Sequence, residues 1–319
     1  MTQSLEALAH RTSSMRGIRS VVHTMKTLSV INSAPYEQAA LAIEAYHATV
    51  LEGLHAFLTR FGPIDMPASD RAARVLIVFG SDHGLCGSYN ETLAAHVSDH
   101  FARIADDPPA VLCVGAQMAD ALTDQRITVE KTFFPAASAD GIGRLANLLT
   151  RRLDALRRES RPRDMAVSLA HVARDDSAGQ KPVLAALLPI DPALLADLRA
   201  KPWASRSLPT YSMPPDDLFL ALVRGHLFAS LFRVIAEALL TENAARLALM
   251  QQAEQSVDDR LEELMSETRM VRQSEITTEL LDVIIGFEAV RKDRIKRPSP
   301  PPARPERDPP ISTPDGTGP

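Results

Sequence analysis

The stretch 79-FGSDHGLCGSYN-90 contains the residues whose types and spacing come closest to a chemical site. It follows an apolar run, 74-RVLIVF-79, and precedes a segment with helical periodicity. A strand that ends in a glycine-rich turn at the start of a helix is where α/β proteins often hold a phosphate or a nucleotide. The stretch also contains Cys86 and His83, which could act as a nucleophile and its base.

Neither chemistry has its full set of residues. Gly80, Gly84 and Gly87 match neither G-x-x-x-x-G-K-S/T nor G-x-G-x-x-G, and the loop has no Lys or Arg to meet a phosphate. Glycines there permit a tight strand-to-helix turn instead. No third group is identifiable to orient a Cys–His pair, and the nine histidines show no metal-ligand spacing. The sequence therefore predicts no catalytic residue, no cofactor and no metal site, and Cys86 and Cys113 are expected to be small buried residues.

Composition limits the class of protein. The 319 residues are 45% hydrophobic and 24% charged, which is ordinary for a globular chain, and the net charge of −5 argues weakly against a nucleic-acid binder. Two cysteines are too few for a disulfide framework, which fits a reducing compartment. We find no apolar run approaching the ~18 to 20 residues that span a bilayer, so a cytosolic or peripheral chain without a transmembrane segment is expected.

Residues 1–65 are predicted to form a coiled-coil helix. Pro35 lacks a backbone donor and crowds the carbonyl of Ile31, so we expect a bend near residues 32–36. The apolar spacing of seven, three, four and three is that of a coiled-coil seam, and its partner must be another long helix. The predicted seam residues are Leu8, Met15, Ile18, Val22 and Met25.

Residues 66–215 are predicted to form a globular α/β domain with an irregular return segment. Short β-rich runs alternate with helical stretches, so we expect a small open sheet with helices on its faces. The return segment, 191–215, contains five prolines and is expected to be irregular. The β-rich runs are 74–80, 110–116, 127–134, 165–172 and 183–190, and the helical stretches include 91–104, 118–122 and 143–158.

Residues 216–297 contain no proline and favour one long helix. If continuous, this helix would be about 120 Å long, because each residue adds about 1.5 Å. Apolar residues recur along it every three or four positions. With the first helix it predicts an α/β protein in which a long antiparallel coiled coil carries an inserted small, Rossmann-like sheet domain. The proline-rich residues 298–319 are predicted to be a disordered tail.

Three stretches, in this order along the chain, resemble the γ subunit of F-type ATP synthases. The first is 16-RGIRSVVHTMK-26, similar to the family's opening helix, which ends in A-M-K. The second is 81-SDHGLCGSYN-90, close to S-D-R-G-L-C-G-G-F-N. The third is the last helix, where 244-AARLALM-250 and 272-RQSEITTEL-280 resemble A-A-R-x-x-A-M and R-Q-x-x-I-T-x-E-L. The ordered set covers residues 1 to about 290 and is far more specific than any one stretch.

The chain also departs from the family pattern. His83 stands where the family usually has Arg, Ser88 where it has Gly, and Thr24 where it has Ala. The stretch 29-SVINSAP-35 replaces one that is normally rich in alanine and lysine, so the predicted bend at Pro35 is not a family feature. The chain continues for 29 residues beyond Val290 (319 minus 290), where the family ends. These departures indicate a divergent branch.

The resemblance implies a non-catalytic, mechanical subunit, the central rotor shaft of F1. It would turn inside a hexamer of α and β subunits and rest with the ε subunit on the c-ring of the membrane sector. It would lie peripherally on the cytoplasmic face of a bacterial plasma membrane, and its helix end, with Leu281, Val283, Ile284, Ile285 and Phe287, would turn in an apolar sleeve. Mapped position by position, the family's contacts with β subunits fall on Met25, Lys26, Arg246, Arg272, Gln273, Thr277 and Glu279.

Two other classes of protein remain open. An α/β enzyme with coiled-coil dimerisation arms would need a pocket with converging titratable groups near His83. A free-standing coiled-coil adaptor would need no surrounding hexamer.

Overall fold

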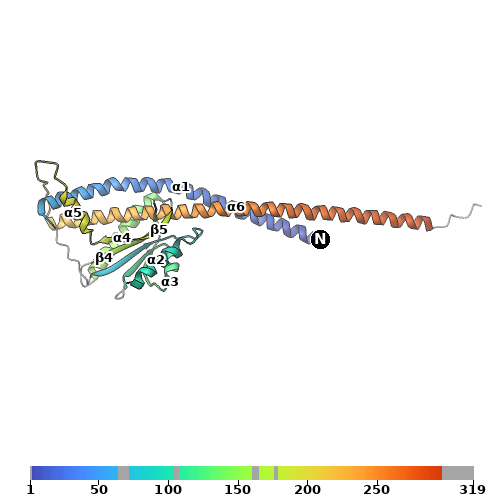
Figure 1. Cartoon of the computed structure of the whole chain (residues 1–319), viewed down its shortest axis with the longest axis horizontal. Coiled ribbons are helices and arrows are strands. Elements are labelled where there is room, and N and C mark those ends of the chain that lie inside the picture. Colours follow the sequence, from blue (N-terminus) through green and yellow to red (C-terminus); the bar gives the residue numbers. More distant parts are fainter. Residues whose placement is uncertain (1, 64–71, 104–107, 160–164, 176–178, 297–319) are drawn as a thin grey trace, which may run out of the picture. The chain divides into compact units, whose positions relative to one another are not determined.

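Figure 1 shows the computed structural model of the chain, which describes residues 2–63, 72–103, 108–159, 165–175 and 179–296. Two compact units make up the fold. One is Met15–Arg260, and the other combines Met1–Ser14 with Leu261–Pro319. The predicted linker at residues 61–70 lies mostly outside the described residues, and the predicted tail at 298–319 lies wholly outside them.

A five-stranded sheet forms the centre of the first unit. Its strand order is β3-β2-β1-β4-β5, in which β5 is antiparallel to β4 and all other neighbours are parallel. The order 3-2-1-4 of the parallel strands is that of a doubly wound nucleotide-binding sheet, as the Rossmann-like prediction requires. Each predicted β-rich run overlaps one strand, which confirms the sheet. The strands are β1 (Ala73–Phe79), β2 (Ala110–Val114), β3 (Val129–Phe133), β4 (Met165–Arg174) and β5 (Gln180–Leu188).

Helices cover both faces of the sheet (Figure 1). Because side chains alternate along a strand, Leu76 and Val78 of β1 face α2 (Tyr89–Arg103) and α3 (Ala116–Asp124). On the other face, Val75 and Ile77 pack against α4 (Ala139–Glu159) and α6 (Pro215–Lys296). The sheet is therefore buried between two helical layers, one of which is the long C-terminal helix itself.

The first helix, α1 (Thr2–Phe61), runs antiparallel to α6 within the first unit (Figure 1). Lys26 pairs with Glu254, and further along α1 His47 meets His226. Buried or half-buried residues recur every seven positions on both helices, which is the repeat of a coiled coil. On α1 they are Met15, Val22, Ser29, Tyr36, Ile43, Val50 and Phe57, and on α6 they include Ala236, Asn243, Met250 and Val257.

One predicted seam residue is wrong. Ile18 is 49% exposed, whereas Val22 is buried and Met15 and Met25 are half-buried. Arg19, the residue after Ile18, contacts α6 instead: its side chain is 55% exposed, and its Nε donates to Asp258 Oδ1 of α6 at 2.6 Å. A charged side chain contacts α6 here because α6 supplies the matching carboxylate, and a pattern of apolar residues alone cannot show that.

Helix α1 is continuous through Pro35. Pro35 is exposed, so its ring faces away from α6. Ser33, two residues earlier, uses its hydroxyl to donate to the Ser29 carbonyl at 2.8 Å. The proline removes one hydrogen bond of the helix without ending it, and the bend expected there stays a prediction.

The return segment is more regular than predicted, because it contains α5 (Pro192–Ala200). Asp191 caps this helix, since its carboxylate accepts from the Ala193 backbone N–H at 2.8 Å, and Pro192 occupies the first helical turn. An aspartate cap followed by a proline in the first turn is typical of a helix start. We interpreted every proline of the segment as a sign of irregular structure and so missed this pattern. The buried Leu198 of α5 packs with Leu54 and Leu58 of α1.

We expected no segment apolar enough to span a bilayer. One 18-residue window of α6 is nevertheless long and apolar enough to do so, judged by length and composition alone. Leu231, Val234 and Ile235 of α6 are buried against the sheet and α4. Only 33% of that window is buried, so part of its apolar composition serves the core and the rest lies on the surface.

Candidate functional site

The loop after β1 is held by its own buried polar groups. Ser81 is completely buried, its backbone N–H donates to Asn90 Oδ1 at 3.0 Å, and its hydroxyl accepts from Asn90 Nδ2 at 2.7 Å. Gly87 has φ of 65°, which favours glycine, and Leu85 adopts a similar φ of 64°. The side chain of Asn90 thus closes the turn, and the glycine-rich sequence serves the loop's conformation.

Cys86 and His83 do not form a nucleophile and base. The Cys86 thiol lies 3.9 Å from the carbonyl oxygen of His83 and 3.4 Å from the Ser81 hydroxyl. Burial raises the pKa of the Cys86 thiol, which keeps it protonated and unreactive. Cys86 and Cys113 are both buried and free, which confirms the prediction made for them.

Helix α6 crosses the carboxyl ends of β1 and β4, where doubly wound sheets bind their ligands. Thr241 of α6 donates to the Val172 carbonyl of β4 at 2.9 Å, and its hydroxyl lies 3.1 Å from the Tyr89 hydroxyl. Arg246 of α6 donates to the His83 carbonyl in the loop after β1 at 3.4 Å. The chain's own helix therefore occupies the edge at which doubly wound sheets bind their ligands.

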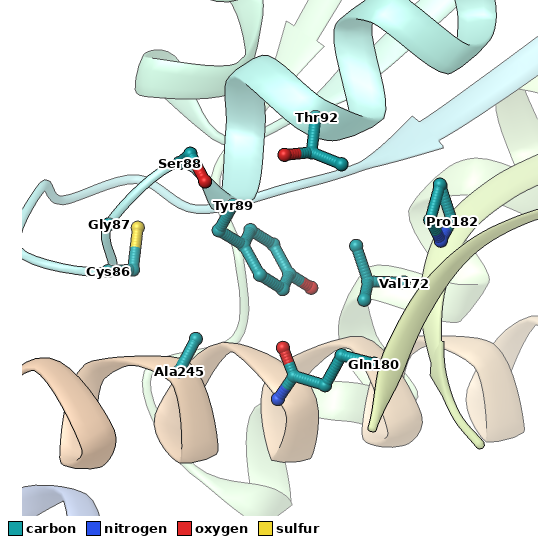
Figure 2. Close-up of a pocket in the computed structure, with 9 residues that line it drawn as sticks. All are labelled: Cys86, Gly87, Ser88, Tyr89, Thr92, Val172, Gln180, Pro182 and Ala245. Carbon is teal, nitrogen blue, oxygen red and sulfur yellow. The ribbon is translucent and has the colours of Figure 1, made fainter. Parts of the chain in front are cut away.

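A pocket of about 310 Å³ lies beside this crossing, and Figure 2 shows its lining. Tyr89 points between α6 and the strands, with Val172 and Gln180 on its far side. The lining carries no charged side chain, so it offers nothing to offset the charge of a phosphate. The lining residues are Cys86, Gly87, Ser88, Tyr89, Thr92, Val172, Gln180, Pro182 and Ala245.

The most buried ion pair near the loop is formed by Glu242 and Arg246. Arg246 Nη2 donates to Glu242 Oε1 at 2.6 Å, and both side chains are largely buried. Burial raises the pKa of Glu242, and Arg246 opposes that rise. Since the same Arg246 nitrogen also donates to the His83 carbonyl, the pair ties the loop to α6.

The seven residues predicted to contact β subunits have different surroundings. Lys26 donates to Glu254 at 2.6 Å and lowers the pKa of that carboxylate, and Met25 beside it is half-buried. Arg246 is held by Glu242. These three lie in the first unit, and the other four are exposed and lie in the second: Arg272, Gln273, Thr277 and Glu279.

Sequence reasoning missed three residues that hold the site together. Thr241 and Glu242 are buried polar residues on α6, and Asn90 closes the loop. Asn90 ends the motif 81-SDHGLCGSYN-90, which is the one sequence signal for its role. Nothing in the sequence of α6 distinguishes Thr241 from its other threonines. Within the described ranges, no three His, Cys, Asp or Glu side chains gather closely enough to hold a metal ion.

Nearly the whole chain is similar to known proteins. A family model described as ATP synthase matches residues 4–290. The ATP synthase gamma chain of Anaeromyxobacter sp. (strain K) is 26% identical over 303 residues, covering 90% of this chain and 99% of its own. The gamma chain of Granulibacter bethesdensis is 25% identical over 311 residues, again covering 90% and 99%.

Solved structures share the fold. A chain of the Euglena gracilis mitochondrial ATP synthase, in a structure of its OSCP/F1/c-ring, aligns with a TM-score of 0.61 at 16% identity, covering 94% of this chain and 98% of its own. A chain of the rotor of the same enzyme aligns with a TM-score of 0.56 at 14% identity, covering 86% and 100%. These likenesses support the fold, and the family match extends over both long helices and the sheet. The chain belongs to the ATP synthase family, as a gamma chain of the F-type enzyme.

Proposed function

We propose that this gamma chain is the rotating central shaft of its F1 sector and has no catalytic site of its own. ATP would be made or hydrolysed on a surrounding hexamer of α and β subunits. The sheet domain, with an ε subunit, would rest on a c-ring at the cytoplasmic face of a bacterial plasma membrane. Ion movement through the membrane sector would then be coupled to the hexamer through rotation of this chain.

The observation that carries the proposal is the surface of the last described turns of α6. Val283, Ile284 and Ile285 are consecutive, and each is more than half exposed. Because consecutive helical residues point about 100° apart, these three side chains face three different directions. Leu280, Leu281 and Phe287 add to the same apolar girdle. A flat partner would cover only one side of such a helix, whereas a surrounding sleeve would cover every side.

Four exposed residues precede this girdle and are the strongest candidates for contacts with β subunits. Gln273 and Thr277 are one turn apart on the same face of α6, and Arg272 and Glu279 share a neighbouring face. The Thr277 hydroxyl donates to the backbone carbonyl of Gln273 at 2.8 Å, so it does not bind the side-chain amide of Gln273. Charge-assisted hydrogen bonds to Arg272, each worth about 1 to 3 kcal/mol, could form and break as β opens and closes.

Met25, Lys26 and Arg246 are proposed as weaker contacts. Lys26 and Arg246 already have carboxylate partners, so a β subunit would have to compete with Glu254 and Glu242. Met25 is half-buried and would offer only part of its surface.

The rival classes lack a supporting observation. The seam of α1 is covered by α6 of the same chain, so the helices are not free dimerisation arms. The pocket beside the loop has two titratable side chains in its lining, those of Cys86 and Tyr89, and burial raises the pKa of both, so neither is ionised near neutral pH.

Copurification with the partner subunits tests the proposal. The tagged chain, coexpressed with the α, β and ε subunits of its own organism, should elute with six larger nucleotide-binding subunits and with ATPase activity. The same tagged chain with Val283, Ile284 and Ile285 replaced by Ser should assemble less well, because the sleeve would meet a polar surface. A stable homodimer that ignores these subunits would refute the proposal.

A further inference from the structure

Contacts between the sheet domain and α6 are of two kinds. Against one face of the sheet, Leu231, Ile235 and their neighbours make apolar contacts, which are not directional. Over residues 237–246 the contacts become polar and reach four separate segments of the domain. These segments are the loop after β1, the start of α2, the end of β4 and the start of β5.

Thr241 is the centre of this polar region and is completely buried. Its hydroxyl donates to the Val172 carbonyl at 2.9 Å and accepts from the Tyr89 hydroxyl at 3.1 Å. The carbonyls of Ala238 and Glu237 in its own helix lie 3.0 Å and 3.1 Å from the same hydroxyl. Its carbonyl accepts from Gln180 Nε2 at 2.9 Å. One residue of α6 therefore holds the end of β4, the start of α2 and the start of β5.

Three further contacts extend the region along α6. The Tyr89 hydroxyl also lies 3.1 Å from the Ala238 carbonyl, and burial raises the pKa of this phenol, which stays protonated as a donor. His171 Nε2 lies 3.5 Å from Glu237 Oε2 one turn earlier. Arg246 reaches the His83 carbonyl one turn later. The attachment spans residues 237–246 on the side of α6 that faces the sheet.

Directional contacts fix what apolar packing leaves free. Apolar attraction has no preferred direction, whereas hydrogen bonds weaken steeply with distance and angle. A buried hydroxyl that loses its partners also costs free energy, because water cannot replace them. The polar region therefore sets the axial and rotational position of the sheet domain on α6.

We propose that Thr241, with Tyr89, is the joint through which torque passes between the sheet domain and the shaft, an inference that rests on the proposed function. Both are positioning residues. The loop 81-SDHGLCGSYN-90 belongs to the same joint through His83 and Tyr89. The glycine-rich turn, in which Gly87 adopts a positive φ, therefore serves the attachment of the loop to α6.

The test uses Thr241→Val, which keeps the shape of the side chain and removes the hydroxyl. In the full complex, the number of ions pumped per ATP hydrolysed should fall, because the shaft turns without carrying the domain fully with it. ATP hydrolysis by the assembly lacking the membrane sector should stay at the wild-type rate, since no load crosses the joint. In the isolated chain, amide hydrogen exchange at the ends of β4 and β5 should accelerate by about 5- to 150-fold, the population change that one unsatisfied buried group produces.

Two further variants and one control complete the test. Tyr89→Phe and Gln180→Ala each remove one bond of the joint and should lower the pumping ratio in the same direction, and Gln180 is exposed enough that its loss does not threaten folding. Thr123→Val is the matched control, since the exposed Thr123 hydroxyl donates only to the Ala119 carbonyl of its own helix α3, at 2.8 Å. It should leave the ratio unchanged.

The outcomes separate the two proposals. A wild-type pumping ratio in all three joint variants, measured beside a coupled wild-type complex, overturns the inference and leaves the proposed function intact. If Thr123→Val lowers the number of ions pumped per ATP as much as the joint variants do, the inference is overturned as well, because the effect would then not be specific to the joint. A wild-type chain that never enters the complex refutes the proposed function, and the inference with it.

Discussion

A buried pair of histidines makes the stability of this chain sensitive to mild acid. His226 of α6 is 7% exposed, and its Nδ1 lies 3.1 Å from His47 Nε2 of α1 inside the coiled coil. Two rings at this distance share one proton between their facing nitrogens, so adding another places two donors against each other. Burial lowers the pKa of His226 from 6.5 to about 4, and His47 and Arg233 add to that effect.

The size of the effect follows from this pKa. A change of one in pKa is worth about 1.4 kcal/mol, so a fall from 6.5 to about 4 corresponds to about 3 kcal/mol of unfolding free energy. The unfolded chain binds a proton at higher pH than the folded chain does. The stabilisation is therefore complete above about pH 6.5 and is lost progressively as the pH falls toward about 4. Burial also lowers the pKa of His47, which acts in the same direction.

Urea unfolding of the isolated chain between about pH 7 and about pH 5 measures this loss. The wild-type chain should lose up to about 2 kcal/mol over this range, most of the full effect of His226. The His226→Leu chain should lose much less, because the buried titrating group is gone. His10→Gln, which removes an exposed histidine of α1, should behave as the wild type does.

Other charged groups near the pair act differently. Glu44 and Arg233 face each other across the same two helices at 3.7 Å. The His171 side chain lowers the pKa of Glu237, so that carboxylate loses its stabilising charge only at pH values below the ordinary range for Glu. If the wild-type and His226→Leu chains lose equal stability between about pH 7 and about pH 5, the reasoning is wrong.

Two further predictions concern the coiled coil and the exposed part of α6. Val22→Asp should destabilise the isolated chain by roughly 3 kcal/mol or more in urea unfolding, because it buries an unpaired charge. Ile18→Asp should change stability by less than about 0.5 kcal/mol, and a large loss in this exposed variant would show that Ile18 is buried after all. The double change Arg272→Ala and Gln273→Ala should lower coupled ATP turnover of the assembled complex while circular dichroism of the isolated chain stays the same. Full coupled turnover would remove both residues from the mechanism.

The sheet and its covering helices could be predicted from the sequence because their signals are local. A run such as 74-RVLIVF-79 is apolar at every position, as a strand buried on both faces must be. The long helix was equally visible, since no proline interrupts residues 216–296. The boundaries proposed between the domains, by contrast, stay predictions.

The polar contacts of the joint could not be predicted, because each one joins residues far apart in the chain. Tyr89 and Thr241 are 152 positions apart, and His83 and Arg246 are 163 apart. A threonine inside a helix-favouring run carries no local sign that its hydroxyl meets a strand. The predicted contact of Arg246 with a β subunit stays a prediction, and the structure shows that its guanidinium also holds Glu242 and the loop.

The coiled coil differs from one that is stable alone in water, and this difference explains the wrong seam residue. Its helix contacts include Arg19 and Lys26, paired with carboxylates of α6. Four further apolar residues lie on the outer face of α1, where more than two-fifths of each residue is exposed. An apolar pattern therefore selected Ile18 in place of Arg19.

Ion pairs this exposed add little stability but fix the register of the two helices. An outer face of this kind lowers the free energy only if another protein covers it, which is what a shaft inside a hexamer requires. The outward apolar residues are Ile18, Val21, Leu28 and Ile31.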